Sequence, residues 1–219
     1  MRSFINHLIS KNRPVLPFAI FAYVLAILVL LLLIFIWFMY KIPMSDLTRD
    51  PVQLLNGRPY TGMLSNLGII IWSATAGICL FVMILGAPYH ELKRERQFFL
   101  LAFLLTLVLL LDDLFLMHDV ILPEDLNISE NFLYAVYGIL SLVFIIFFRN
   151  DILQTPYLLL MAAVLFFGFS ISIDTIVKYL NLPHGFFLED GSKFLGIISW
   201  GTYFTYAGFR AINRQKLPQ

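Results

Sequence analysis

The chain has 219 residues, of which 60% are hydrophobic and 13% are charged, with a formal net charge of +1 and a mean hydropathy of +0.84. Soluble domains carry about 25% charged residues, so this composition excludes a soluble globular domain and predicts a protein whose solvent is mostly lipid.

Long apolar stretches recur along the chain, and each approaches the ~20 residues that a helix needs to cross the hydrocarbon core. The first is too long for a signal-peptide core, so it is predicted to be a retained helix. The prolines lie in loops or first turns, so no span is expected to absorb a proline kink. The predicted spans cover residues 15–40, 64–87, 97–122, 131–149, 156–179 and 187–209. We therefore expect an all-α bundle of six transmembrane helices, forming a single transmembrane domain over residues 1–219.

Arg and Lys gather at the end of the predicted bundle that holds both termini, whereas Asp and Glu gather at the opposite end. Cytoplasmic loops of membrane proteins are enriched in Lys and Arg. This predicts cytoplasmic termini in the bacterial cytoplasmic (inner) membrane, with the acidic end facing the exterior or periplasm. The expected partners are the lipid bilayer and a membrane protein or a second copy of this chain. Membrane topology accounts for the positions of the basic residues, so no nucleic acid is expected among the partners.

Two adjacent carboxylates, Asp112 and Asp113, lie near the outer end of the third predicted span. A charged side chain at bilayer depth costs about 3 kcal/mol on insertion scales, so an acidic pair there indicates a functional site. The fifth and sixth predicted spans carry charged residues at the same end of the bundle. We therefore predict a site whose catalytic residues are Asp112, Asp113, Asp174, Lys178 and Lys193.

Carboxylates outnumber basic groups in this predicted cluster, and buried carboxylates in excess take up protons or bind a cation. Histidine and carboxylate side chains form a ligand set that zinc, iron or manganese accepts. The candidate metal ligands are His118, Asp119, His184, Glu189 and Asp190. Their spacing matches no ligand motif such as HExxH. At about 100° per residue, a regular helix places Asp113 and His118 about 140° apart.

Neighbouring spans carry stripes of small and hydroxyl-bearing residues that are suited to packing against a polar centre. The stripes are Tyr134, Tyr137, Gly138 and Ser141 on the fourth span, and Asn66, Ser73 and Gly77 on the second. A purely structural interpretation also fits the charged cluster. In that interpretation Asp174 pairs with Lys178, Glu189 or Asp190 pairs with Lys193, and the same lysines or helix-terminal amides satisfy the Asp112–Asp113 pair.

The segment LLDDLFLM resembles the LLDELPM-type segment of alkaline ceramidases, membrane hydrolases with a zinc site in a helix bundle. The resemblance implies a functional role for Asp112 or Asp113. It does not extend to the rest of that family's pattern. The preceding span reads SATAGICL where the family has Ser-x3-His, the last span lacks HxxxH, and six spans are predicted where the family has seven.

Taken together, these features favour metal-dependent hydrolysis of a membrane-embedded lipid in a pocket lined by carboxylate, histidine and lysine side chains. Two alternatives remain. One is proton or cation translocation through the Asp and Lys cluster. The other is an accessory or assembly subunit of a membrane complex.

Overall fold

The computed structural model describes residues 16–42, 46, 51–58, 60–85, 93–180 and 186–215. Within these ranges the chain forms helices and turns, and no strand occurs. The all-α prediction is confirmed. Contacts divide the chain into two compact units, residues 1–61 and 62–219, and each is described by itself.

The first unit contains α2 (Leu16–Tyr40) and the short helix α4 (Pro51–Leu54). Among the described residues, the second unit contains α5 (Met63–Leu85), α6 (Lys93–Phe115), η2 (Met117–Asp125), α7 (Glu130–Phe147), α8 (Arg149–Leu153), α9 (Leu158–Leu180) and α10 (Phe186–Gln215). That the two units together form one transmembrane domain stays a prediction.

Four helices of the second unit are long and apolar enough to cross a membrane: α5, α6, α7 and α9. This supports an integral, multi-pass membrane protein. Helices α2 and α10 occupy the first and sixth predicted ranges. Their membrane crossing, and the cytoplasmic placement of the termini, stay predictions.

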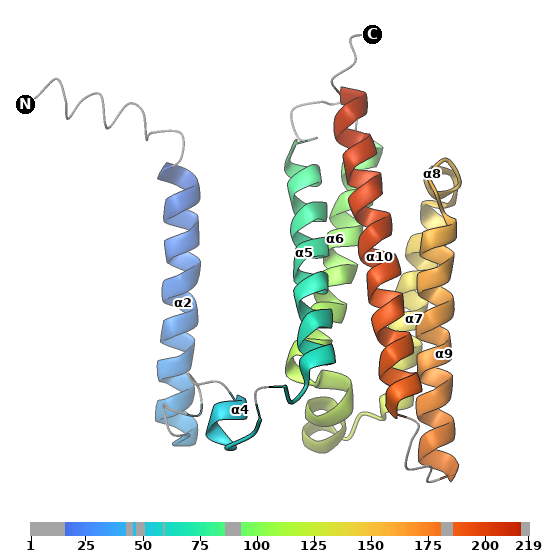
Figure 1. The fold of residues 1–219 in the computed structure, drawn as a ribbon. Helices are drawn as coiled ribbons and strands as arrows, with labels where there is room; N and C mark the ends of the chain where they lie inside the picture. The colour runs from blue at the N-terminus through green and yellow to red at the C-terminus, as the bar shows by residue number, and fades with distance from the viewer. Residues whose placement is uncertain are drawn as a thin grey trace, which may run out of the picture. The chain divides into compact units, whose positions relative to one another are not determined.

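The long helices of the second unit run alternately up and down the bundle (Figure 1). The closest packing is between α9 and α10, between α5 and α6, and between α5 and α10. Helix α10 therefore lies between α5 and α9. The alternation brings the C-terminal ends of α6 and α9 to the same end of the bundle as the N-terminal ends of α5, α7 and α10.

The predicted third span, 97–122, is not one continuous helix. Helix α6 ends at Phe115, and Leu116 adopts a left-handed conformation with φ of 52°. The nine residues from Met117 to Asp125 then wind as a wider π-helix, in which the Ile121 amide donates to the Leu116 carbonyl at 3.3 Å. Pro123 lies inside this π-helix rather than in a loop. The break matters because it turns the residues after Leu116 back over the end of α6.

Aromatic side chains fill the end of the bundle opposite the acidic residues of the predicted site, where α6 begins and α7 ends. Phe98 of α6 contacts Phe144, Phe148 and Phe204 with ring centroids 5.1–5.9 Å apart. Pairs of this kind contribute about 0.5–1.5 kcal/mol each beyond the area they bury. Because lipid tails are as apolar as the side chains, van der Waals packing of this kind holds membrane helices together.

Gly196 of α10 packs directly against the Phe167 ring of α9. A Cβ atom at this position would lie 2.6 Å from the Phe167 ring. That ring cannot easily move, because it stacks on Trp72 at a centroid distance of 5.8 Å and meets the edge of Trp200 at 6.4 Å. A larger residue at 196 would therefore push the two helices apart.

We predict that Gly196→Ala lowers the free energy of unfolding by about 1–2 kcal/mol, because overpacking outweighs the helix propensity that alanine adds. Gly77→Ala on α5 is the matched control, since its Cβ would meet nothing within 4 Å. The control is expected to be as stable as the wild type or more stable. Thermal unfolding in detergent measures both, and equal stability of the two variants would contradict the packing argument.

Candidate functional site: an acidic pocket at one end of the bundle

A pocket of about 430 Å³ lies within the second unit, lined by residues of α5, α6, η2, α7, α9 and α10. Eight of the ten predicted site residues line it: Asp112, Asp113, His118, Asp119, Asp174, Glu189, Asp190 and Lys193. The side chain of Lys178 is not among those described, and His184 lies outside the described residues. Residues far apart in the sequence are therefore brought together at one end of the bundle.

The carboxylate of Asp112 is buried and bonded at both oxygens, and only 4% of the residue is exposed. Its Oδ1 accepts hydrogen bonds from the Tyr137 hydroxyl at 2.8 Å and from the His118 amide at 3.0 Å. Its Oδ2 lies 2.5 Å from Nδ1 of the His118 ring. The left-handed residue Leu116 makes this possible, because it returns His118 to the end of the helix that carries Asp112. The separation of about 140° between Asp113 and His118 assumes a regular helix that continues through residue 118, and α6 ends at Phe115.

Asp113 is bonded by two other helices. Its Oδ2 accepts a hydrogen bond from Nε1 of Trp72 on α5 at 2.8 Å. Its Oδ1 lies 2.6 Å from Nζ of Lys193 on α10. Lys193 thus reaches across to the carboxylate of a facing helix, which is one of the pairings that the structural interpretation of the sequence allowed.

Tyr134 of α7 joins two further carboxylates. Its hydroxyl donates to Oε1 of Glu130 at 2.8 Å and lies 3.3 Å from Oδ2 of Asp174 on α9. Asp174 is buried. The tyrosine stripe predicted on the fourth span therefore contacts the acidic residues directly.

His118 is buried, and its two ring nitrogens face different carboxylates. Nδ1 lies against Asp112, whereas Nε2 lies 3.4 Å from Oδ2 of Asp119. Burial alone lowers the pKa of His118, but the hydrogen bond and the negative charge of Asp112 raise it by more, so the pKa lies above its ordinary value. The ring is therefore held in one orientation by a charged partner.

Two groups of side chains in the described residues have donor atoms that lie within 4.8 Å of one another and can hold a metal ion. The first group is Asp112, Asp113 and His118, and the second is His118, Asp119 and Glu130. Glu130 was missed in the sequence. The sequence feature that indicates Glu130 is the preceding Ser129. The Ser129 side chain caps α7 by accepting a hydrogen bond from the Phe132 amide, which places Glu130 in the first turn of the helix.

The stripe predicted on the second span does not face the pocket. Asn66, Ser73 and Gly77 are exposed on α5, and Trp72 lines the pocket instead. The buried face of α5 follows a helical period through Gly68, Trp72, Thr75, Ala76, Cys79 and Val82. That period is the sequence feature that indicates the inward face of α5, and the predicted stripe lies on the exposed face.

The other half of the pocket is apolar. Its wall contains Leu109 of α6, Leu142 and Ile145 of α7, and Val164 and Phe167 of α9. Charged and apolar walls thus meet in one cavity, which is typical of sites for amphiphilic small molecules.

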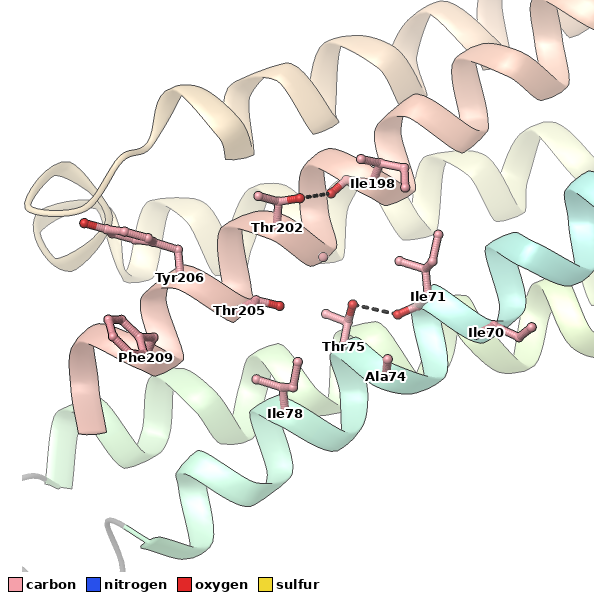
Figure 2. A pocket seen from close by; sticks show the side chains of 11 residues that line it. Ile70, Ile71, Ala74, Thr75, Ile78, Ile198, Thr202, Thr205, Tyr206 and Phe209 are labelled. Carbon is pink, nitrogen blue, oxygen red and sulfur yellow. Dashed lines mark hydrogen bonds between the residues drawn. The ribbon is translucent and has the colours of Figure 1, made fainter. Parts of the chain in front are cut away.

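A second hollow of about 580 Å³ lies between α5 and α10 (Figure 2). Thr75 and Thr202 line it, and each hydroxyl donates at 2.7 Å to a carbonyl of its own helix. Its lining contains no carboxylate, imidazole or amine. We therefore place the candidate chemistry in the acidic pocket.

A protein-family model described as a domain of unknown function, DUF8692, matches residues 21–207. The chain belongs to this family. No curated protein and no solved structure matched the chain. The residues that line the acidic pocket of this DUF8692 member run from Trp72 to Trp200, so the matched segment contains all of them.

We predict that Asp113 and Lys193 of this DUF8692 chain are energetically coupled. Asp113→Asn and Lys193→Gln should each lower the free energy of unfolding, because each leaves a partly buried partner uncompensated. The double variant should lose less than the sum, with a coupling of about 1–3 kcal/mol. The side chains of Asp113 and Lys193 are 10% and 35% exposed.

The matched control is the surface pair Arg94 and Asp151, which is 2.9 Å apart with side chains 55% and 37% exposed. A cycle of Arg94→Gln and Asp151→Asn should give a coupling below about 1 kcal/mol. Thermal unfolding of all six variants measures both couplings. A pocket coupling no larger than the surface coupling would contradict the prediction.

Proposed function

We propose that the chain is a metal-dependent hydrolase that acts on a membrane-embedded lipid, with its metal held by His118, Asp119 and Glu130. The observation that carries the proposal is the arrangement of His118, whose Nδ1 is fixed by Asp112 while Nε2 faces Asp119. Metal-ligating histidines commonly donate their other ring nitrogen to a carboxylate in this way.

The distances favour Nε2 as the metal-binding nitrogen. Ligand bonds of about 2.1 Å at tetrahedral angles place neighbouring ligand atoms about 3.4 Å apart. The His118 Nε2 to Asp119 Oδ2 distance is 3.4 Å. By contrast, the 2.5 Å between His118 Nδ1 and Asp112 is a hydrogen-bond distance and leaves no room for both atoms to bind one ion. Both oxygens of Asp113 are already bonded, to Trp72 and Lys193.

The position of Glu130 also supports this set of metal ligands. The Tyr134 hydroxyl donates to Glu130 and orients it, and Asp112 orients the ring of His118 in the same way. Two carboxylates and one imidazole leave the fourth position of a tetrahedral site for water. Zinc, manganese and iron all accept this ligand set. A bound ion of this kind supplies a hydroxide nucleophile at neutral pH.

The remaining pocket residues have roles in the proposed hydrolysis of an ester. The oxygen of water bonds to the carbonyl carbon, and the bond from that carbon to the leaving oxygen breaks. Asp174, which lies 3.3 Å from the hydroxyl that holds Glu130, accepts the proton of the water and passes it to the leaving oxygen. The ammonium of Lys193 stabilises the negative charge that develops on the carbonyl oxygen.

Translocation of protons or cations has less support. Trp72, Phe167 and Trp200 pack together at the apolar side of the pocket, with centroid distances of 5.8–6.4 Å. The buried charged groups of the described residues, Asp112, His118 and Asp174, lie at one end of the bundle. A subunit role is compatible with the fold, but no feature of the described residues favours it over hydrolysis.

Metal content tests the proposal. After incubation with zinc, manganese or iron(II) and dialysis, the wild type should retain about one equivalent of one metal, measured by elemental mass spectrometry. His118→Ala and Asp119→Asn should retain almost none. Asp125→Asn is the matched control, because Asp125 is exposed on the same helix η2 and does not line the pocket. Folded wild-type protein that retains no stoichiometric metal would overturn the proposal.

A separate prediction concerns Asp112 as an orienting residue. Asp112→Asn should weaken metal affinity by about 10–100-fold without abolishing binding, because the ring of His118 loses a charged partner but keeps a hydrogen-bonding one. A competition titration with a chelator measures the affinity. Complete loss of binding in a folded variant would instead assign Asp112 as a direct ligand.

A further inference from the structure

The apolar half of the acidic pocket reaches the outside of the bundle between α7 and α9. These two helices are not among the closely packed pairs of the second unit. Leu142 of α7 and Val164 of α9 both line the pocket, yet they are 55% and 42% exposed. The wall of the cavity is therefore also part of the surface that faces the surrounding lipid.

Two glycines keep this opening wide. Gly138 of α7 and Gly168 of α9 line the pocket and are exposed. A Cβ added at either position would meet nothing within 4 Å. A slot between the two helices, bordered by Gly138, Leu142, Val164 and Gly168, thus leads sideways from the membrane into the pocket.

The charge at the inner end of the slot limits what can enter. Among the described residues, six carboxylates line the pocket against one lysine and one histidine. Carboxylates remain in excess even with a divalent ion bound and with Lys178 counted among the bases. The negative electrostatic potential of the carboxylates would repel an anionic headgroup and attract a cationic one.

We infer that the pocket takes a lipid sideways through the slot between α7 and α9, with a hydrocarbon chain along the apolar wall and an ammonium-bearing headgroup against the carboxylates. The inference rests on the proposed function only in naming this lipid as the substrate. Burial of the chain stabilises the bound lipid relative to water, but the surrounding bilayer buries the chain as well. In the membrane the headgroup therefore decides which lipid is preferred, since every lipid offers a chain.

The test is equilibrium binding of radiolabelled dodecylammonium, with dodecanoate and dodecanol as probes of equal chain length, to protein in maltoside micelles. Binding beyond micellar partition should be saturable at about one equivalent and at least tenfold tighter for dodecylammonium than for dodecanoate. Gly138→Leu and Gly168→Leu should abolish it, because leucine fills the slot. Gly77→Leu, whose Cβ likewise meets nothing within 4 Å and which lies outside the pocket, should bind as the wild type does.

Equal binding of dodecanoate, or unchanged binding by folded Gly138→Leu and Gly168→Leu, would overturn the inference. His118→Ala separates it from the proposed metal site, since this variant should lose metal but retain dodecylammonium. Wild-type protein that binds metal but not dodecylammonium overturns the lipid inference alone. Wild-type protein that binds dodecylammonium but no metal overturns the hydrolase proposal and leaves the lipid site standing.

Discussion

The carboxylate of Asp112 is the group on which the arrangement of the pocket depends. It is buried and accepts from the backbone of η2, from the ring of His118 and from the hydroxyl of Tyr137. A buried carboxylate without such partners would cost several kcal/mol. Satisfying it therefore fixes where α6 ends, how η2 begins and which face α7 turns inward. The orientation of His118, and with it the proposed metal site, follows from these contacts.

The same ion pairs serve stability and chemistry. Asp112 faces His118 and Asp113 faces Lys193, so each of these two adjacent carboxylates has a basic partner. This neutralisation lets two adjacent acids remain at the end of an apolar helix. The same two pairs place the His118 imidazole, two carboxylates and the Lys193 ammonium around one cavity. The structural interpretation of the cluster and the functional one therefore describe the same contacts.

The positions of the helices could be predicted from hydropathy, because stretches such as 64–87 and 131–149 fall close to α5 and α7. The order and direction of the predicted spans also indicated that charges of distant segments share one end of the bundle. The contact of Asp112 with His118 could not be predicted, because a left-handed residue is usually marked by glycine or asparagine and position 116 is leucine. Regular-helix geometry fails beyond such a residue. Trp72 was missed because its partner Asp113 lies on another helix. Glu130 was missed because the side chains that it joins in the candidate metal group, His118 and Asp119, lie on η2.

The tryptophans that line the pocket make intrinsic fluorescence a probe of the cavity. The chain has three tryptophans, and Trp72 and Trp200 both line the pocket with ring centroids 6.1 Å apart. Nε1 of Trp72 donates to Asp113, so its indole senses the charge of that carboxylate. The third, Trp37, belongs to α2 and can be replaced by phenylalanine. The emission of the remaining pair then follows the polarity of the cavity, and its wavelength changes when water there is displaced.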